Sequence, residues 1–217
     1  MSVNVDAEKR AYKKFRDAGM TAAGACGLIG NLEAESDGFY TNRVEYLCLK
    51  RLKENGKVYT DTTYTAAIDS GKISCEEFLH PLSEDSMGTV WRSGQVQGEN
   101  QSMDLAKQKG VSIANEDMQI EYLLKELQES YGAVLKILKT TTSICEASDV
   151  VLKRFEIPAN TGKSVCAGRA ARGQKFYDNY AKGVTNMTVQ QKRESSITWM
   201  ENTAKDDSHG YDQDNRW

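Results

Sequence analysis

The apolar positions of the chain show a clear helical period near the N-terminus, in residues 19–36. Apolar side chains recur there with the period of a helix, after Thr21 as a plausible N-cap: Ala22, Ala25, Leu28, Ile29 and Leu32. The same stretch carries Gly24, Gly27 and Gly30, and each glycine weakens a helix by about 1 kcal/mol relative to alanine. Their clustering predicts a helix against which other backbone packs very closely.

Most of the remaining chain also predicts helices. The ranges are 7–18, 46–55, 64–69 and 168–180. An apolar stripe from Ile120 to Leu138 predicts one long helix that can bend at Gly132. Ser143 and Glu146 have capping-box spacing for a helix that must stop before Pro158. With only 2 prolines and few alternating β-branched residues, the predicted fold is all-α or mainly α.

Composition indicates a medium-sized domain with an appendage. The chain has 217 residues, of which 39% are hydrophobic and 27% charged, enough to bury a core. The net charge is -3 and no basic block contains interleaved aromatics, so nucleic acid is not an expected partner. No apolar run approaches the length of a membrane span, and residues 1–15 are too polar for a signal peptide. Neither a membrane partner nor secretion by the general pathway is therefore expected.

Cysteine and histidine usage narrows the chemistry. The 5 cysteines are widely spaced without a C-x-x-C pair, which predicts free thiols. His80 and His209 lie too far apart to predict a zinc site or a Ser-His-Asp triad, and no cofactor is expected. Acid–base catalysis by carboxylates is the remaining enzymatic option. Glu33 and Glu35 leave the apolar helix on opposite flanks, but a carboxylate at such an edge is most often only the boundary with solvent.

The motif Gly-Asn-Leu-Glu-Ala-Glu-Ser at residues 30–36 resembles the start of the phage tail lysozyme family, which is related to goose-type lysozymes and lytic transglycosylases. Residues 64–72, 104–113 and 155–160 resemble later blocks of that family in the same order. The resemblance implies a lysozyme-like domain over residues 1–181. It makes Glu35, the glutamate immediately before the serine, the catalytic acid, and Ser36 and Asn31 substrate-binding residues.

The resemblance further implies a muramidase, acting on the β-1,4 bond between N-acetylmuramic acid and N-acetylglucosamine of bacterial peptidoglycan. Its acid must stay protonated near neutral pH. An apolar setting beside Leu28, Asn31 and Leu32 would favour that form of the acid by desolvation. No second carboxylate stands out, and proximity alone suggests the following candidates: Asp37, Glu45 and Asp61. A lytic transglycosylase that forms an anhydro product is therefore an open alternative.

The C-terminal residues differ in composition from the rest. Residues 182–198 are polar and typical of a linker. Residues 199–217 resemble the opening of a cysteine-dependent wall peptidase or amidase domain, whose nucleophile would lie beyond Trp217; an unstructured acidic tail is the alternative. The expected setting is extracellular or virion-associated, in a phage tail or a larger secreted wall hydrolase.

Residues 87–99 depart from the family. Relatives carry Gly-Tyr-Gly-Leu-Ala-Gln-Trp-Thr beside the catalytic glutamate, lining the glycan cleft, whereas this segment reads MGTVWRSGQVQGE. Codons for this segment can be chosen so that a one-base displacement reads Gly-Tyr-Gly-Leu-Ala-Gln-Trp followed by Thr-Ser-Thr-Gly-Arg-Lys. We hypothesise a compensated pair of indels in the gene or its sequencing, which would leave a mobile polar loop in place of the cleft wall. The non-enzymatic alternative is an inactive or weakly active peptidoglycan-binding remnant.

Overall fold

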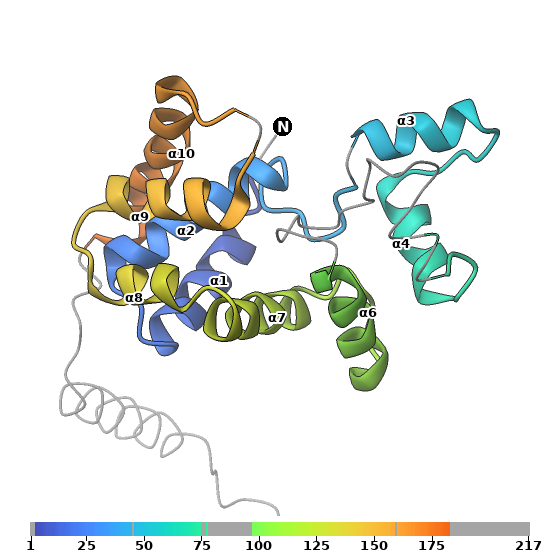
Figure 1. Ribbon diagram of the computed structural model, residues 1–217, viewed down its shortest axis with the longest axis horizontal. Helices are drawn as coiled ribbons and strands as arrows, with labels where there is room; N and C mark the ends of the chain where they lie inside the picture. Colours follow the sequence, from blue (N-terminus) through green and yellow to red (C-terminus); the bar gives the residue numbers. More distant parts are fainter. Residues whose placement is uncertain (1–2, 45, 75–76, 78–96, 159, 183–217) are drawn as a thin grey trace, which may run out of the picture. The chain divides into compact units, whose positions relative to one another are not determined.

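The chain folds mainly into α-helices (Figure 1). The computed structural model describes residues 3–44, 46–74, 77, 97–158 and 160–182. Its helices are α1 (Val5–Asp17), α2 (Ala22–Glu35), α3 (Tyr46–Glu54), α4 (Asp61–Asp69), α6 (Gln97–Lys109), α7 (Glu116–Glu129), α8 (Gly132–Thr140), α9 (Ile144–Val151) and α10 (Lys163–Phe176), with π-helical turns η1 (Leu152–Glu156) and η2 (Tyr177–Ala181). These residues contain no strand, so the predicted fold class is confirmed.

Two compact units divide the chain, Met1–Tyr180 and Ala181–Trp217. The predicted peptidase-like stub at residues 199–217 lies outside the described residues, as does the predicted linker apart from Lys182. Residues 87–96 of the unusual segment also lie outside them. Residues 97–99 form the start of α6, so the predicted polar loop does not extend to Glu99.

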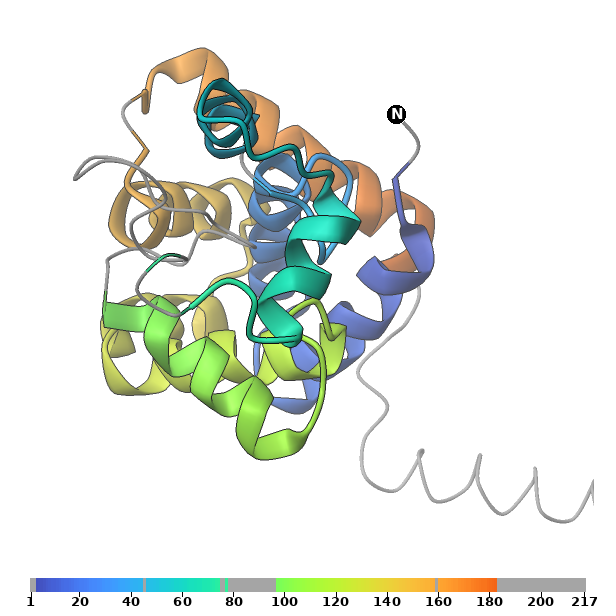
Figure 2. The same cartoon turned by 90° about the vertical axis from the view of Figure 1, so that its right-hand side faces the viewer.

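Helix α2 is the buried element around which the first unit packs. Thr21 caps it, accepting a 2.8 Å hydrogen bond from the Gly24 amide, as the sequence predicts. Helices α1, α8, α9 and α10 all contact it (Figures 1 and 2). Every residue from 23 to 33 is buried. The helix therefore has no solvent-facing side until its C-terminal end.

The glycines of α2 are where neighbouring backbones touch it. A Cβ atom added at Gly24 would lie 1.9 Å from the carbonyl oxygen of Leu138 on α8. The same addition at Gly27 would lie 2.4 Å from the Ala147 Cβ on α9, and at Gly30 it would lie 2.3 Å from the Arg169 carbonyl oxygen on α10. The close backbone packing predicted from the glycine cluster is confirmed, and each of the three glycines lets a different helix approach α2 closely.

Replacing Gly27 by alanine is expected to destabilise the fold although alanine favours helix formation. The new methyl group would also lie 2.7 Å from the Ser148 backbone nitrogen, so α9 must shift, at a cost of about 1–3 kcal/mol. Gly168→Ala is the control, because no atom lies within 4 Å of its added Cβ in the interior of α10, and it should be neutral or stabilising. Urea unfolding of both variants checks the prediction; equal midpoints would contradict it.

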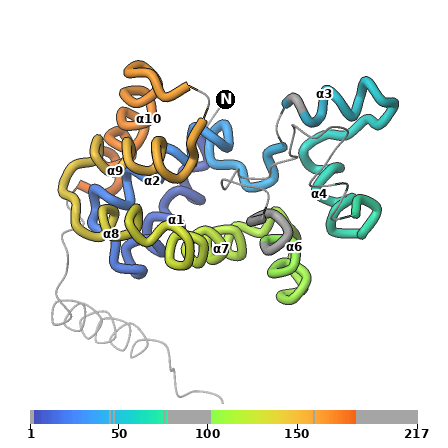
Figure 3. The backbone as a smooth tube through the Cα atoms, in the orientation of Figure 1, coloured from blue at the N-terminus to red at the C-terminus, as the bar shows by residue number. Residues whose placement is uncertain are grey.

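Several helix boundaries differ from the predicted ones; Figure 3 traces the backbone through these helices. The stripe from Ile120 to Leu138 forms two helices, since α7 ends at Glu129 and α8 begins at Gly132. Ser143 accepts from the Glu146 amide as predicted, at 3.2 Å, but the Glu146 carboxylate accepts from the Thr141 hydroxyl. Helix α10 starts five residues earlier than predicted, at Lys163. The last turn of the preceding helix ends before Pro158, as expected.

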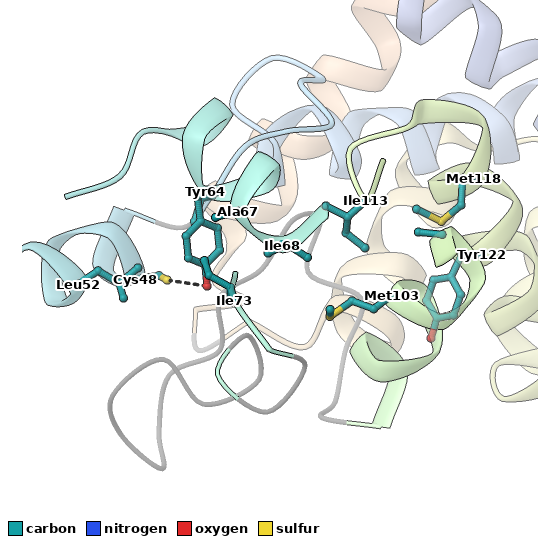
Figure 4. Close-up of a cluster of buried hydrophobic side chains, with 12 residues drawn as sticks. Cys48, Leu52, Tyr64, Ala67, Ile68, Ile73, Met103, Ile113, Met118 and Tyr122 are labelled. Carbon is teal, nitrogen blue, oxygen red and sulfur yellow. Dashed lines mark hydrogen bonds between the residues drawn. The ribbon is translucent and has the colours of Figure 1, made fainter. Parts of the chain in front are cut away.

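A second cluster of buried side chains joins α3, α4 and α6 to α7 (Figure 4). Tyr64 and Ile68 of α4 pack there with Met118 and Tyr122 of α7. Among the described cysteines, Cys26 and Cys48 are buried and Cys145 is exposed. Cys26, Cys145 and Cys166 are free thiols, as predicted. Within the described ranges we find no helix with the length and apolar character needed to span a bilayer.

Candidate active site

Helix α2 ends at the predicted catalytic glutamate because the following turn cannot continue a helix. Glu35 is its last residue and Ser36 its C-cap. The Ser36 hydroxyl donates to the Leu32 carbonyl oxygen at 2.6 Å, so this side chain satisfies the helix end. Asp37 and Phe39 then adopt positive φ angles of 50° and 68°. This local structure places Glu35 where the buried helix ends.

Glu35 lies against an arginine of α10. The Arg169 guanidinium donates from Nη2 to Glu35 Oε1, and from Nη1 to the Asn31 carbonyl and side-chain oxygens, both at 3.4 Å. The exposed fractions of the two side chains are 22% for Glu35 and 11% for Arg169. The apolar setting predicted for Glu35 is therefore wrong, since a partly buried arginine that follows it by 134 residues contacts its carboxylate.

Glu33 pairs with the same helix one turn further along. Arg172 Nη1 donates to Glu33 Oε1 at 2.6 Å, and the exposed fractions are 47% for this arginine and 10% for Glu33. The two glutamates were expected on opposite flanks of α2, yet each contacts α10. Glu35 is the more accessible carboxylate, and its arginine is the more buried one.

Asn31 and Ser36 use their polar groups inside the protein. Asn31 is fully buried, and its amide nitrogen donates to the Gly27 carbonyl oxygen at 2.9 Å and to the Ser148 hydroxyl at 3.1 Å. Ser36 is also buried, on the hydrogen bond to Leu32. Asn31 thereby ties α2 to α9 and, through Arg169, to α10. The contact of Asn31 and Ser36 with substrate remains a prediction.

Two of the candidate second carboxylates share one arginine. Arg43 donates to Asp37 Oδ2 from Nη2 and to Asp61 Oδ2 from Nη1, the latter at 2.9 Å. Asp61 also accepts from the Val44 amide at 3.0 Å, so it fixes the chain before α3. The third candidate, Glu45, lies outside the described residues. The structure thus brings Asp37 and Asp61 together around one cation.

A further carboxylate, which the sequence reading did not single out, lies buried beside α2. Glu8 of α1 is 3% exposed, and among the described residues its Oε1 has no hydrogen-bond partner. The pKa of the Glu8 carboxyl group is raised from 4.5 to about 7, mainly by burial and also by the negative charge of Glu33 on α2, while Lys175 on α10 lowers it. Only the amphipathic pattern of α1 could have indicated this position, and that pattern does not distinguish a buried glutamate from an exposed one.

The raised pKa of Glu8 predicts a pH-dependent fold stability. Between about pH 4.5 and 7 the folded chain keeps a proton that the unfolded chain releases, so stability falls as pH rises through this window, by up to about 3 kcal/mol. Glu8→Gln mimics the protonated acid and should remove most of this dependence. Glu121→Gln, at a side chain of α7 that is 56% exposed, is the control and should keep it. Urea unfolding from pH 4.5 to 8 measures both, and parallel curves would refute the assignment.

Other sites are less suited to the predicted chemistry. Within the described ranges, no group of three His, Cys, Asp or Glu side chains could hold a metal ion. A cavity of about 460 Å³ lies between α4 and α6, next to Asp69, Lys107 and Ser112. None of its lining residues belongs to α2 or α10. The end of α2 therefore remains the candidate active site.

Comparison with known proteins identifies the family. The sequence model of the phage tail lysozyme family matches residues 6–180. The match spans α1 to α10 and includes both glutamates and their arginine partners. No curated protein matches the chain. Because the family match covers well over half of its length, this chain belongs to the phage tail lysozyme family.

Proposed function

We propose that this protein is a muramidase in which Glu35 is the general acid for cleavage of the bond between N-acetylmuramic acid and N-acetylglucosamine. Family membership makes it a lytic enzyme that acts on peptidoglycan, in a secreted or virion-associated setting. The observation that carries the proposal is the place of Glu35, an accessible carboxylate on the last residue of an otherwise buried helix. Such a position combines a rigid support with access for substrate.

The proposed chemistry begins with proton transfer from Glu35 to the glycosidic oxygen. The bond between that oxygen and C1 of N-acetylmuramic acid breaks, and its electron pair stays on the departing oxygen. Water then adds to C1 and loses a proton, which restores the acid. In the described part of the chain Arg169 donates to Oε1 of Glu35, so Oε2 is the oxygen that we assign to the transferred proton.

The base that activates this water is a separate question. Asp37 and Asp61 are candidates that share Arg43, and Glu45 is the third. If no second carboxylate activates a water, a hydroxyl group of the N-acetylmuramic acid itself can attack C1 and give its proton to the Glu35 carboxylate, and the product is the anhydro sugar of a transglycosylase. We propose hydrolysis, supported by family membership alone, and the mass of the product distinguishes the two reactions.

Digestion of purified peptidoglycan sacculi tests the proposal, with the full chain and with the chain that carries the displaced-frame reading of residues 87–99, because the unchanged segment is expected to weaken lysis. Soluble muropeptides that end in reducing N-acetylmuramic acid are the expected product in mass spectrometry. Products lighter by one water would identify a transglycosylase, and reducing N-acetylglucosamine would assign a different bond. Binding to sacculi without release by either form of the chain would favour the inactive remnant and contradict the proposal.

A further inference from the structure

The α2–α10 contact does more than close the core, because it brings one arginine to the proposed acid. A Cβ atom at Gly30 would lie 2.3 Å from the Arg169 carbonyl oxygen, and one at Gly173 would lie 2.4 Å from the Cys26 carbonyl oxygen. The two helices therefore touch backbone to backbone at Arg169 and again one turn later, at Gly173. Because the two helices lie so close together, the guanidinium group of Arg169 has few positions open to it.

The guanidinium of Arg169 binds the helical turn that carries Glu35 as well as its carboxylate. Its Nη2 donates to Glu35 Oε1, while its Nη1 lies 3.4 Å from the carbonyl oxygen of Asn31, four residues earlier on α2. A planar guanidinium that bonds two groups at once has a fixed orientation. Asn31 is itself held by α9 through Ser148. The position of the Glu35 carboxyl group is thus tied to three helices.

The neighbouring pair shows what an ordinary ion pair between these helices looks like. Arg172 makes one hydrogen bond, to Glu33, and its side chain is 47% exposed against 11% for Arg169. Exposed ion pairs contribute little to stability, so no special role is needed to explain the Arg172 contact. Arg169 differs in its burial and in its second anchor on Asn31.

We propose that Arg169 is a positioning residue, which holds the Glu35 carboxyl group through Oε1 and leaves Oε2 to face the scissile bond. The inference rests on the proposed function of Glu35. Misplacing a reacting group by about 1 Å can cost about 100-fold in rate, so the loss of this anchor acts on the chemical step. Arg169 itself does not contact the glycan in this scheme, and substrate affinity should change little.

Steady-state kinetics of Arg169→Gln, Arg169→Lys and Arg172→Gln test the inference, with thermal unfolding of each variant alongside. We use the full chain or, if its lysis is too slow to measure, the chain carrying the displaced-frame reading of residues 87–99. Arg169→Gln is expected to lower kcat about 10- to 100-fold with KM within about twofold of the original. Arg169→Lys should recover part of the loss, because one ammonium group can make one of the two contacts. Arg172→Gln should leave kcat and KM within about twofold.

Equal effects of Arg169→Gln and Arg172→Gln would overturn the inference, and so would a rise in KM at unchanged kcat, which assigns Arg169 to glycan binding. If Arg169→Gln does not fold, Arg169→Lys decides: a lower kcat at constant KM supports positioning, and an unchanged kcat refutes it. Glu35→Gln, measured in parallel, separates this inference from the proposed function. Activity in Glu35→Gln, or inactivity of both chain forms, overturns both proposals. An inactive Glu35→Gln beside a normal Arg169→Gln overturns the inference alone.

Discussion

Glu35→Gln is expected to abolish muropeptide release from sacculi while the protein remains folded. Glutamine is nearly isosteric with the protonated acid, but it has no acidic proton to give to the leaving oxygen. General acid catalysis contributes about 10²- to 10⁴-fold, so release should fall to the background of the assay. Arg169 joins α10 to the end of α2 through Glu35. Glutamine keeps an acceptor oxygen for this contact, so the protein should stay folded. Release is measured by mass spectrometry, and folding by circular dichroism and thermal unfolding.

Glu33→Gln is the matched control on the same helix. Glu33 also pairs with an arginine of α10, but its side chain is only 10% exposed, and this arginine is accessible to water. The substitution keeps one acceptor for Arg172 and removes a negative charge beside Glu8. We expect activity within about twofold of the original chain. Equal losses from Glu33→Gln and Glu35→Gln would remove Glu35 as the unique acid.

Replacing residues 87–99 by the displaced-frame reading is expected to restore or greatly increase lysis. The new segment would read Gly-Tyr-Gly-Leu-Ala-Gln-Trp-Thr-Ser-Thr-Gly-Arg-Lys and so would contain the family's cleft block. Substrate positioning beside an acid can contribute several kcal/mol, and we therefore expect a gain of about 100-fold or more in released muropeptides. The chain with its own residues 87–99 should fold, because the helices that bury α2 lie outside this segment. It should show weak or absent lysis, because the cleft block is missing.

Two controls keep this prediction specific. Glu35→Gln in the replaced chain should remove the gain, which shows that the new segment serves the same acid. Circular dichroism should show unchanged helix content, because only residues 97–99 of the segment belong to a described helix.

Sequencing of the gene decides the origin of residues 87–99: codons that do not shift into the family block would refute the hypothesis of paired indels. Robust lysis by the printed chain would identify residues 87–99 as a functional variant.

The core helix could be predicted from sequence because its signals are local. Thr21 caps the segment, and the apolar residues after it follow the helical period. The three glycines also predict close packing. Each of them lowers the stability of the helix, and a closely packed neighbouring backbone compensates for that loss. Which neighbour each one meets could not be read, because Leu138, Ala147 and Arg169 lie more than 100 residues away.

The site was predictable only in part for the same reason. The motif ending in Ser36 predicts Glu35 as the acid, which stays a prediction, but the apolar period of α2 does not indicate the arginine that contacts this residue. Arg169 and Arg172 are three residues apart on α10, a spacing equally typical of a solvated helix face. The break between α7 and α8 was missed because leucine and tyrosine continue the apolar stripe across Ser130, where the helix ends.

The burial of α2 by helices far along the chain has a consequence for synthesis on the ribosome. Arg169 follows Glu35 by 134 residues, and chains grow at about 5–20 residues per second. Helix α2 is therefore synthesised on the order of ten seconds before α8, α9 and α10 are complete and can bury it. During that interval its glycines favour an unfolded chain, and its leucines are available to chaperones. The proposed acid, Glu35, can therefore meet Arg169 only after almost the whole lysozyme domain has been made.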